Sequence, residues 1–421
     1  MLQKPPPPLT PPPSKPTTTT KLTTKCKATT LLLTLLILLL LLSLSSTSPQ
    51  VTTPTPSRDL RLFPTTPPPY ILNTTTTTTS VAYFVTGSSG DLSSIFRLLL
   101  SIYHPNNLYL VHIDRFAPQS DRDRLAIWVS SLPVFRAARN VHVVGNPDFV
   151  YVKGSSPLSS LLRGVSILLR LSHRWDWFIN LSPHHYPFLT QDDLLHVLSY
   201  LPKDLNFVNH TGYIGWKESR RLKPIIVDPG LYLSEKSAMF YATQKRDLPS
   251  AYQMFSGSPT SVLNRKFMEY CILGSDNLPR TLLMYLANTQ SSLLNYVPTI
   301  LCNSQEFKET VVNHNLQYSR ENPRQQLNLS DFNAMIQSGS AFGTKFRQND
   351  PILDRIDREI LGRAPGKVVP GGWCLGESND ACQVWGDATI LRPGPGAKRL
   401  EKRIVSLLSN GAYQSQQCIS Q

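Results

Sequence analysis

Residues 174–193 read RWDWFINLSPHHYPFLTQDD, and this stretch decides the expected fold. The apolar and aromatic run at 175–179 has the composition of a buried strand, and the polar, proline-containing segment after it ends that strand. Thr190 then offers an N-cap to a helix whose first turn carries Asp192 and Asp193, as the helix dipole favours. A strand, a polar loop and a helix in this order are typical of α/β enzymes, whose ligands lie beyond the carboxyl ends of the strands. Taken alone, the stretch fits an ordinary buried strand and connection equally well.

Strands and helices alternate on both sides of this stretch, starting near residue 80. Runs with strand composition lie at 81–87, 108–114 and 141–144, and runs with helical periodicity lie at 92–103, 125–132 and 158–171. This alternation predicts an α/β domain over residues 80–421 with a mostly parallel central sheet. The order loosens beyond residue 208, and the chain closes with a basic helix at 398–408.

Three segments of biased composition precede this domain. Residues 1–27 are rich in Pro, Thr and Lys, so we expect a disordered tail. Residues 28–45 form an uncharged, leucine-rich run that is long enough for one transmembrane helix in a thin bilayer. Residues 46–79, rich in Ser, Thr and Pro, predict an extended stem. Lysines precede the apolar run, and no charge follows it until Arg58. This asymmetry predicts a cytosolic N-terminus and a lumenal domain. A cleaved signal peptide and a transit peptide fit the pattern less well.

Charge and cysteine usage narrow the classes of function. The net charge of +14 suits an anionic ligand, while no nucleic-acid-binding motif accompanies it, so nucleic acid is not an expected partner. Five of the six cysteines lie beyond the apolar run, so at least one of those five stays free or bridges two chains. Their spacing matches no zinc site.

A possible divalent-metal motif occurs at residues 121–123, which read Asp-Arg-Asp. We interpret it instead as the charged first turn of an amphipathic helix, because apolar residues follow it at helical spacing. If the ligand is a diphosphate, basic side chains must then neutralise it in place of a metal. The candidates are Lys345, Arg347, Lys367 and the cluster at 398–403.

The chain resembles plant members of glycosyltransferase family 14, which are related to animal core-2/I-branching N-acetylglucosaminyltransferases. The resemblance covers nearly all of residues 81–410 and rests on several stretches in the same order. They include YHPNNLYLVHIDRFAP, DLNFVNHTGYIGWKE, KPIIVDPGLY, DNLPRTLLMY, CNSQEFKETVVNH, FGTKF and GKVVPGGWC. The resemblance implies a GT-A-like fold and inverting chemistry without a metal or other cofactor. It implies a UDP-sugar as the donor and a glycan or glycoprotein as the acceptor. It also implies that the protein is a Golgi membrane protein of type II topology. Glucuronic acid is the sugar it implies first and N-acetylglucosamine the second, with β-galactan chains of arabinogalactan proteins as the acceptor.

The resemblance also places individual residues near the substrates. It implies donor-binding roles for Asp114, Tyr151, Lys153, Gly154 and Lys345, with Lys345 at the diphosphate. It implies acceptor-binding roles for Ser256, Gly257 and Ser258.

Two positions depart from the family pattern. His185 stands before Tyr-Pro where members usually carry an acid. Leu294 stands where the resemblance places a catalytic glutamate, and leucine cannot accept a proton. Glu269, Asp276 and Glu306 are the nearby carboxylates that could substitute. The alternative hypothesis is therefore a catalytically impaired relative that still binds a UDP-sugar or a glycan.

Overall fold

The computed structural model describes residues 79–409, apart from 213, 237, 323–324 and 378–380, together with Cys418. The chain divides into two units at residue 58, and every described residue belongs to the second unit. The predicted tail at 1–27, the apolar run at 28–45 and nearly all of the predicted stem lie outside the described residues. Within the described part of the chain, none of the helices combines the length and the apolar character needed to cross a membrane.

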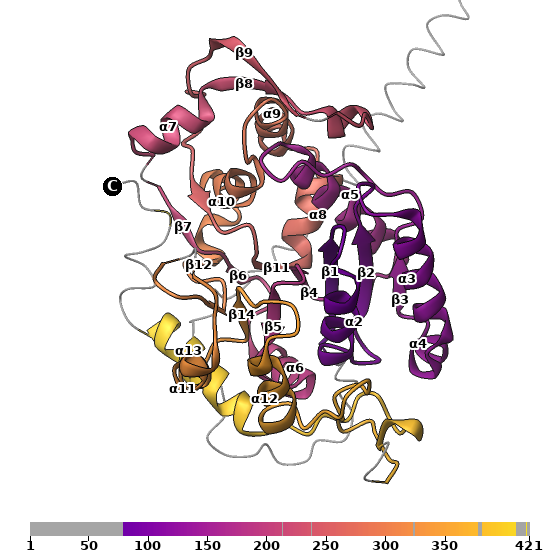
Figure 1. Cartoon of the computed structure of the whole chain (residues 1–421). Helices are drawn as coiled ribbons and strands as arrows, with labels where there is room; N and C mark the ends of the chain where they lie inside the picture. The colour runs from indigo at the N-terminus through magenta and orange to yellow at the C-terminus, as the bar shows by residue number, and fades with distance from the viewer. Residues whose placement is uncertain are drawn as a thin grey trace, which may run out of the picture. The chain divides into compact units, whose positions relative to one another are not determined.

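A seven-stranded mixed sheet forms the centre of the domain (Figure 1). Strand β11 runs antiparallel to both of its neighbours, and the other pairs are parallel, which confirms the prediction of a mostly parallel sheet. In spatial order the strands are β12 (Val311–Val312), β6 (Asn206–Phe207), β11 (Val262–Asn264), β4 (Trp177–Leu181), β1 (Val81–Gly87), β2 (Leu108–Ile113) and β3 (Val141–Val143).

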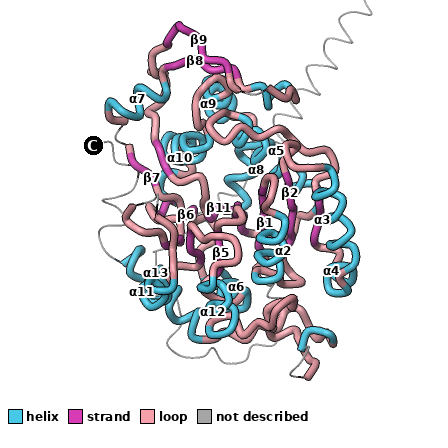
Figure 2. The backbone as a smooth tube through the Cα atoms, viewed as in Figure 1, coloured by secondary structure: helices cyan, strands magenta, loops and turns pink. Residues whose placement is uncertain are grey.

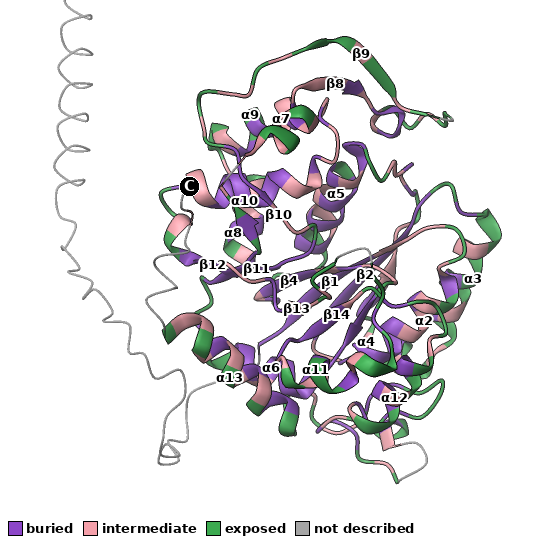
Figure 3. Cartoon of the chain, turned by 60° about the vertical axis from the view of Figure 1, so that its left-hand side comes forward, coloured by how far each residue is buried: buried purple, intermediate pink, exposed green. Residues whose placement is uncertain are grey.

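Alternate residues of the strands feed two apolar cores on opposite faces of the sheet. In β1, Val81, Tyr83 and Val85 belong to one core, and Ala82 and Phe84 belong to the other, as the period of two in a strand requires. Figure 2 shows helices flanking the strands, and Figure 3 shows buried strands between helices with exposed outer faces. The first core contains residues of α2 (Leu92–Ser101), α3 (Gln119–Ser131), α4 (Pro133–Ala138), α6 (Gln191–Tyr200), α11 (Phe332–Gln337), α12 (Pro351–Glu359) and α13 (Pro395–Ser409). The second contains residues of α5 (Ser156–Leu171), α7 (Trp216–Leu222), α8 (Arg265–Leu273), α9 (Asn277–Leu286) and α10 (Leu293–Asn303).

Smaller sheets surround the central one. A three-stranded sheet joins β13 (Gln317–Tyr318), β14 (Phe342–Thr344) and β5 (His185–Pro187), and two pairs join β10 (Ser256–Gly257) with β7 (His210–Thr211) and β8 (Pro224–Val227) with β9 (Phe240–Lys245). Short 3₁₀ helices occupy Pro229–Tyr232, Lys308–Thr310, Leu329–Asp331 and Ala381–Gln383.

The expected helix start at Thr190 is confirmed. The Thr190 side chain accepts the backbone N–H of Asp193 at 3.1 Å, and the Asp193 carboxylate accepts the N–H of Thr190 at 3.1 Å, so the two residues form a capping box. Asp193 also accepts the N–H of Gly394 at 2.6 Å, just before α13. The capping residues therefore tie the start of α6 to the C-terminal helix.

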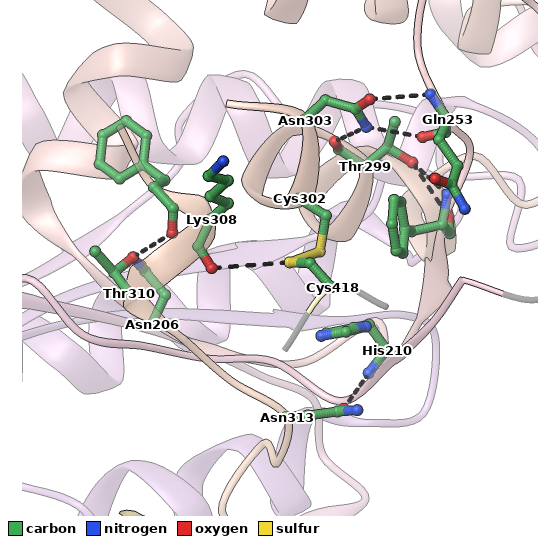
Figure 4. The surroundings of a disulfide bond; sticks show 12 residues. Asn206, His210, Gln253, Thr299, Cys302, Asn303, Lys308, Thr310, Asn313 and Cys418 are labelled. Atoms are coloured by element: carbon green, nitrogen blue, oxygen red, sulfur yellow. Dashed lines mark hydrogen bonds between the residues drawn. A yellow bond between two sulfur atoms is a disulfide. The ribbon is translucent and has the colours of Figure 1, made fainter. Parts of the chain in front are cut away.

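Four cysteines form two disulfides, Cys302–Cys418 and Cys374–Cys382. Cys271 has no disulfide partner among the described residues, which confirms that the cysteines beyond the apolar run cannot all pair with one another. Cys302 lies near the end of α10, so its disulfide fixes Cys418 beside that helix (Figure 4).

Candidate active site

Asp114 and Tyr151, two of the predicted donor-binding residues, are linked through Phe116. Asp114 follows β2 directly and accepts the backbone N–H groups of Phe116 at 3.0 Å and Ala117 at 3.2 Å. Burial raises the pKa of the Asp114 carboxyl, and these hydrogen bonds counteract the rise. The Phe116 ring meets the Tyr151 ring edge-on at 5.1 Å between centroids. Asp114 thus lies at the carboxyl end of β2, and the contact through Phe116 brings Tyr151 close to the same edge of the sheet.

Gly154, the last residue of the predicted donor loop, packs against a buried aspartate, Asp228, to which the sequence analysis gave no role. The fully buried Asp228 accepts the backbone N–H groups of Ser155 at 2.8 Å and Ser156 at 2.7 Å, where α5 begins. It also accepts the N–H of Gly230 at 2.8 Å. A Cβ atom at residue 154 would lie 1.9 Å from an Asp228 carboxylate oxygen, so this position requires glycine. Asp228 therefore fixes the loop through a negative charge at a helix N-terminus.

The start of α10 connects this donor loop to the predicted acceptor segment. The Ser291 N–H donates to the Lys153 carbonyl at 2.9 Å. One turn later, Asn295 donates to the Phe255 carbonyl at 2.8 Å, next to Ser256. Leu294 lies between these two contacts, in the first turn of the helix. The structure therefore places Leu294 between the predicted donor and acceptor segments.

The three carboxylates considered as substitutes for the catalytic base have other partners. Glu269 accepts a hydrogen bond from Arg265 at 2.7 Å, and Glu306 pairs with Lys266 at 2.7 Å. Asp276 caps α9 by accepting the N–H of Leu278 at 2.8 Å. These contacts give each carboxylate a structural role; a catalytic role for any of them stays a prediction.

The acceptor segment is held by backbone contacts with β7. Gly257 pairs with His210, and a Cβ atom at residue 257 would lie 2.3 Å from the Asn209 carbonyl oxygen. The Ser258 N–H donates to the same carbonyl at 3.0 Å, and the Ser258 hydroxyl accepts a hydrogen bond from Asn315 at 3.0 Å. The segment is therefore rigid, and Ser258 faces a group of polar residues.

This polar group encloses a cavity of about 480 Å³, which we call the serine-rich cavity. Its lining residues are Asn209, Ser258, His314, Asn315, Gln317, Tyr318, Ser319, Ser338, Ser340, Thr344 and Arg403. The exposed Lys345 directly follows Thr344. The cavity thus brings Ser258 of the predicted acceptor segment to the same hollow as Thr344, whereas Lys345, Asp114, Tyr151 and Gly154 are not among its lining residues. Two of the lining residues, Arg403 and His314, were not assigned a role individually from the sequence. Arg403 belongs to the basic cluster at 398–403 that was a candidate for binding the diphosphate. His314 occurs only as the last residue of the quoted CNSQEFKETVVNH stretch.

The structure also shows the surroundings of the Asp-Arg-Asp motif at residues 121–123 and of His185, which stands where the family usually has an acid. The Asp121 and Asp123 pair lies in the first turns of α3, as predicted, where Asp121 contacts Arg124 at 3.7 Å and Asp123 accepts from Gln119 at 2.8 Å. His185 is buried, and burial lowers its pKa to about 4.

One group of three potential metal-ligating side chains occurs among the described residues, namely His210, Cys302 and Cys418, with ligand atoms within 4.8 Å of one another (Figure 4). The two sulfur atoms are joined in a disulfide, and a thiolate rather than a disulfide sulfur is the usual metal ligand. The buried His210 ring has no hydrogen-bond partner on either nitrogen among the described residues, and burial lowers its pKa to about 4.

Acid is expected to destabilise this domain through its buried histidines. Burial lowers the pKa of His210 to about 4 from the ordinary histidine value of 6.5, so the unfolded chain binds more protons between those two pH values. Stability is therefore full above pH 6.5 and falls as the pH drops toward 4, by on the order of 3 kcal/mol per such histidine. Urea unfolding at pH 7 and pH 4.5 measures the loss. The His210→Leu variant should lose less than the unmodified chain, whereas His173→Leu, at an exposed histidine, should lose the same amount.

Comparison with known proteins gives a consistent set of relatives. Residues 81–333 match the family model named Branch and described as core-2/I-branching enzyme. The chain is 48% identical over 345 residues to "Beta-glucuronosyltransferase GlcAT14A" from Arabidopsis thaliana, a match that covers 80% of this chain and 77% of that protein. It is 47% identical to "Beta-glucuronosyltransferase GlcAT14B" and 43% identical to "Beta-glucuronosyltransferase GlcAT14C" from the same plant, with 80% of this chain and 80% and 84% of those proteins covered.

Proposed function

The chain belongs to the core-2/I-branching enzyme family of glycosyltransferases, and we propose that it transfers glucuronic acid from UDP-glucuronate to β-galactan side chains of arabinogalactan-type glycoproteins. The observation that carries this proposal is the identity of 43–48% to three proteins named as β-glucuronosyltransferases, over most of their length. The α/β domain with its mixed, mostly parallel sheet supports a GT-A-like assignment.

The proposed reaction is an inverting displacement at the anomeric carbon. A general base removes the proton from an acceptor hydroxyl as its oxygen attacks that carbon, and the UDP diphosphate leaves with the electrons of the broken bond. Lys345 supplies positive charge for the diphosphate, and the loop at 151–154 with Asp114 holds the nucleotide. The segment at 256–258 holds the acceptor, and α10 presents residue 294 between donor and acceptor.

The test is a transfer assay with the residues from 80 onward expressed together with their stem. Incubation with UDP-glucuronate and a β-galactooligosaccharide in the presence of EDTA should give a product that is heavier by one glucuronosyl residue, measured by mass spectrometry. The assay includes EDTA because we propose metal-independent chemistry, in which basic side chains neutralise the diphosphate. A product formed only from UDP-N-acetylglucosamine would contradict the proposed donor, and no product from either sugar would contradict the activity.

We also propose that the protein is a single-pass Golgi membrane protein of type II topology. The proposal rests on the apolar run at 28–45 and on the lysines before it, which predict a cytosolic N-terminus. In sealed microsomes, added protease should remove only the N-terminal tail from an antibody-detected full chain. Digestion of the folded domain without detergent would contradict this topology.

A further inference from the structure

The lining of the serine-rich cavity carries positive charge and no negative charge. Its lining includes neutral hydrogen-bonding side chains and one permanent cation, Arg403, and no aspartate or glutamate among the described residues. Two other partly or fully buried arginines of the domain lie beside carboxylates: Arg363 contacts Asp357 at 2.5 Å, and Arg320 contacts Asp331 at 2.8 Å. No ion pair with Arg403 is formed by the described residues, and its Nε atom is buried without a hydrogen-bond partner there. A guanidinium that lines a cavity without a carboxylate partner favours an anionic ligand.

His314 adds a second donor at the same point. Its Nδ1 atom accepts the backbone N–H of Leu316 at 3.0 Å, so the neutral ring carries its proton on Nε2. Burial keeps the ring neutral by lowering its pKa to about 4, and the Arg403 charge lowers that pKa further. The Nε2 atom lies 3.1 Å from Arg403 Nη2, so in this tautomer two donors face each other. A single acceptor oxygen beside them would receive hydrogen bonds from both groups.

We propose that the serine-rich cavity binds the carboxylate of a hexuronic acid, with Arg403 and the His314 Nε2–H group as its donors. The inference rests on the proposed function and extends it, because it names the residues that select an acidic sugar over a neutral one. The hydroxyl and amide groups of Ser258, Asn315 and Gln317 face the same hollow and suit the hydroxyl groups of a sugar ring. Thr344 also lines the cavity, and Lys345, the predicted diphosphate residue, follows it directly in the chain.

Backbone geometry supports a built site at this place. Gly339 has a φ of +66°, and a Cβ atom there would lie 2.6 Å from the Arg399 carbonyl oxygen and 2.9 Å from Arg403 Cβ. The loop can therefore lie against α13 only with glycine at residue 339. This close approach brings Ser338 and Ser340 into the lining together with Arg403.

Calorimetry tests the inference by measuring the affinities of UDP-glucuronate and UDP-glucose for the domain expressed with its stem. The two ligands differ only at C6 of the sugar, which is a carboxylate in glucuronate and a hydroxymethyl group in glucose. Arg403→Gln should weaken UDP-glucuronate binding by about ten- to a hundredfold, the scale of a hydrogen bond to a charged group, and leave UDP-glucose binding unchanged. Arg403→Lys should restore much of the preference. Arg136→Gln, which removes the same charge from an exposed position on α4 outside the proposed sites, should change neither affinity.

A second pair of ligands, a β-galactooligosaccharide with and without a glucuronate cap, separates the two sources of a hexuronate. If the carboxylate belongs to a sugar already on the glycan, Arg403→Gln should weaken binding of a glucuronate-capped β-galactooligosaccharide and not of UDP-glucuronate. An equal loss for acidic and neutral ligands, or no loss for any of them, would overturn the assignment, provided that melting temperatures show folded variants. If the unmodified domain binds none of the four ligands, the proposed function fails as well. If it binds them and Arg403→Gln leaves the affinity for both acidic ligands unchanged, only the inference is overturned.

Discussion

Leu294→Glu is expected to raise the rate of glucuronate transfer by about a hundredfold or more, because general-base catalysis contributes about 10²–10⁴-fold. The family resemblance places a glutamate at this position. The structure supports the same position, since α10 starts beside the Lys153 carbonyl and reaches the Phe255 carbonyl one turn later. The measurement is the initial rate of product formation with saturating UDP-glucuronate, compared between the variant and the unmodified chain.

The same substitution should cost little stability, which separates catalysis from folding. Leu294 is only partly buried and is not among the apolar residues that pack against either core. Its place in the first turn of α10 also favours a negative charge there. Leu293 is the matched control, because its side chain packs against the second core. Leu293→Glu should therefore lower the melting temperature and give no gain in transfer.

The outcome also decides between the two hypotheses for this chain. A gain in rate identifies residue 294 as the position where the base was lost. A Leu294→Glu variant with normal stability and no gain in transfer rate contradicts that interpretation. In that case, either another carboxylate already serves as the base, or the chain is a relative that binds substrates without turning them over. In the first case, replacement of Glu269, Asp276 or Glu306 one at a time should abolish transfer for one of them.

The first half of the fold could be predicted because its signals are local. The strand at 81–87 has its predicted bounds, and the capping box at Thr190 could be located from four consecutive residues. By contrast, β7 and β10 are two residues long and exist only because they pair with each other. The helix α10 was not predicted from the sequence, and Pro298 in its interior is a residue that locally disfavours a helix.

The candidate site was predicted only in part, for a related reason. Ser258 and Lys345 were named from the resemblance, and the cavity brings Ser258 close to Thr344, which precedes that lysine. Asp228, His314 and Arg403 were not named for these roles, because each depends on a partner far away in sequence. Asp228 acts on Ser155 over 73 residues, and Arg403 meets His314 over 89 residues. Sequence spacing carries no information on such contacts in a single chain.

Asp228→Ala is expected to lower the free energy of unfolding by about 3 kcal/mol or more, because it leaves buried N–H groups that a charged acceptor had satisfied. Three backbone N–H groups lose their acceptor, those of Ser155, Ser156 and Gly230. UDP affinity should fall together with stability, since the same carboxylate holds the loop that ends at Gly154.

Denaturant unfolding and UDP calorimetry on the same preparations check both effects of removing Asp228. Asp247→Ala is the control, because Asp247 is exposed and pairs only with Lys223 at 3.3 Å, a surface contact that contributes at most about 1 kcal/mol. Asp228→Asn should resemble the alanine variant. The asparagine side chain has one oxygen, whereas the two carboxylate oxygens of Asp228 accept the N–H groups of Ser155 and Ser156 on one side and of Gly230 on the other. The asparagine amide N–H group would therefore face a backbone N–H donor. A stable Asp228→Ala variant with normal UDP affinity would show that the Gly154 loop holds its shape without the carboxylate, and the donor-binding role assigned to that loop would then need a different physical basis.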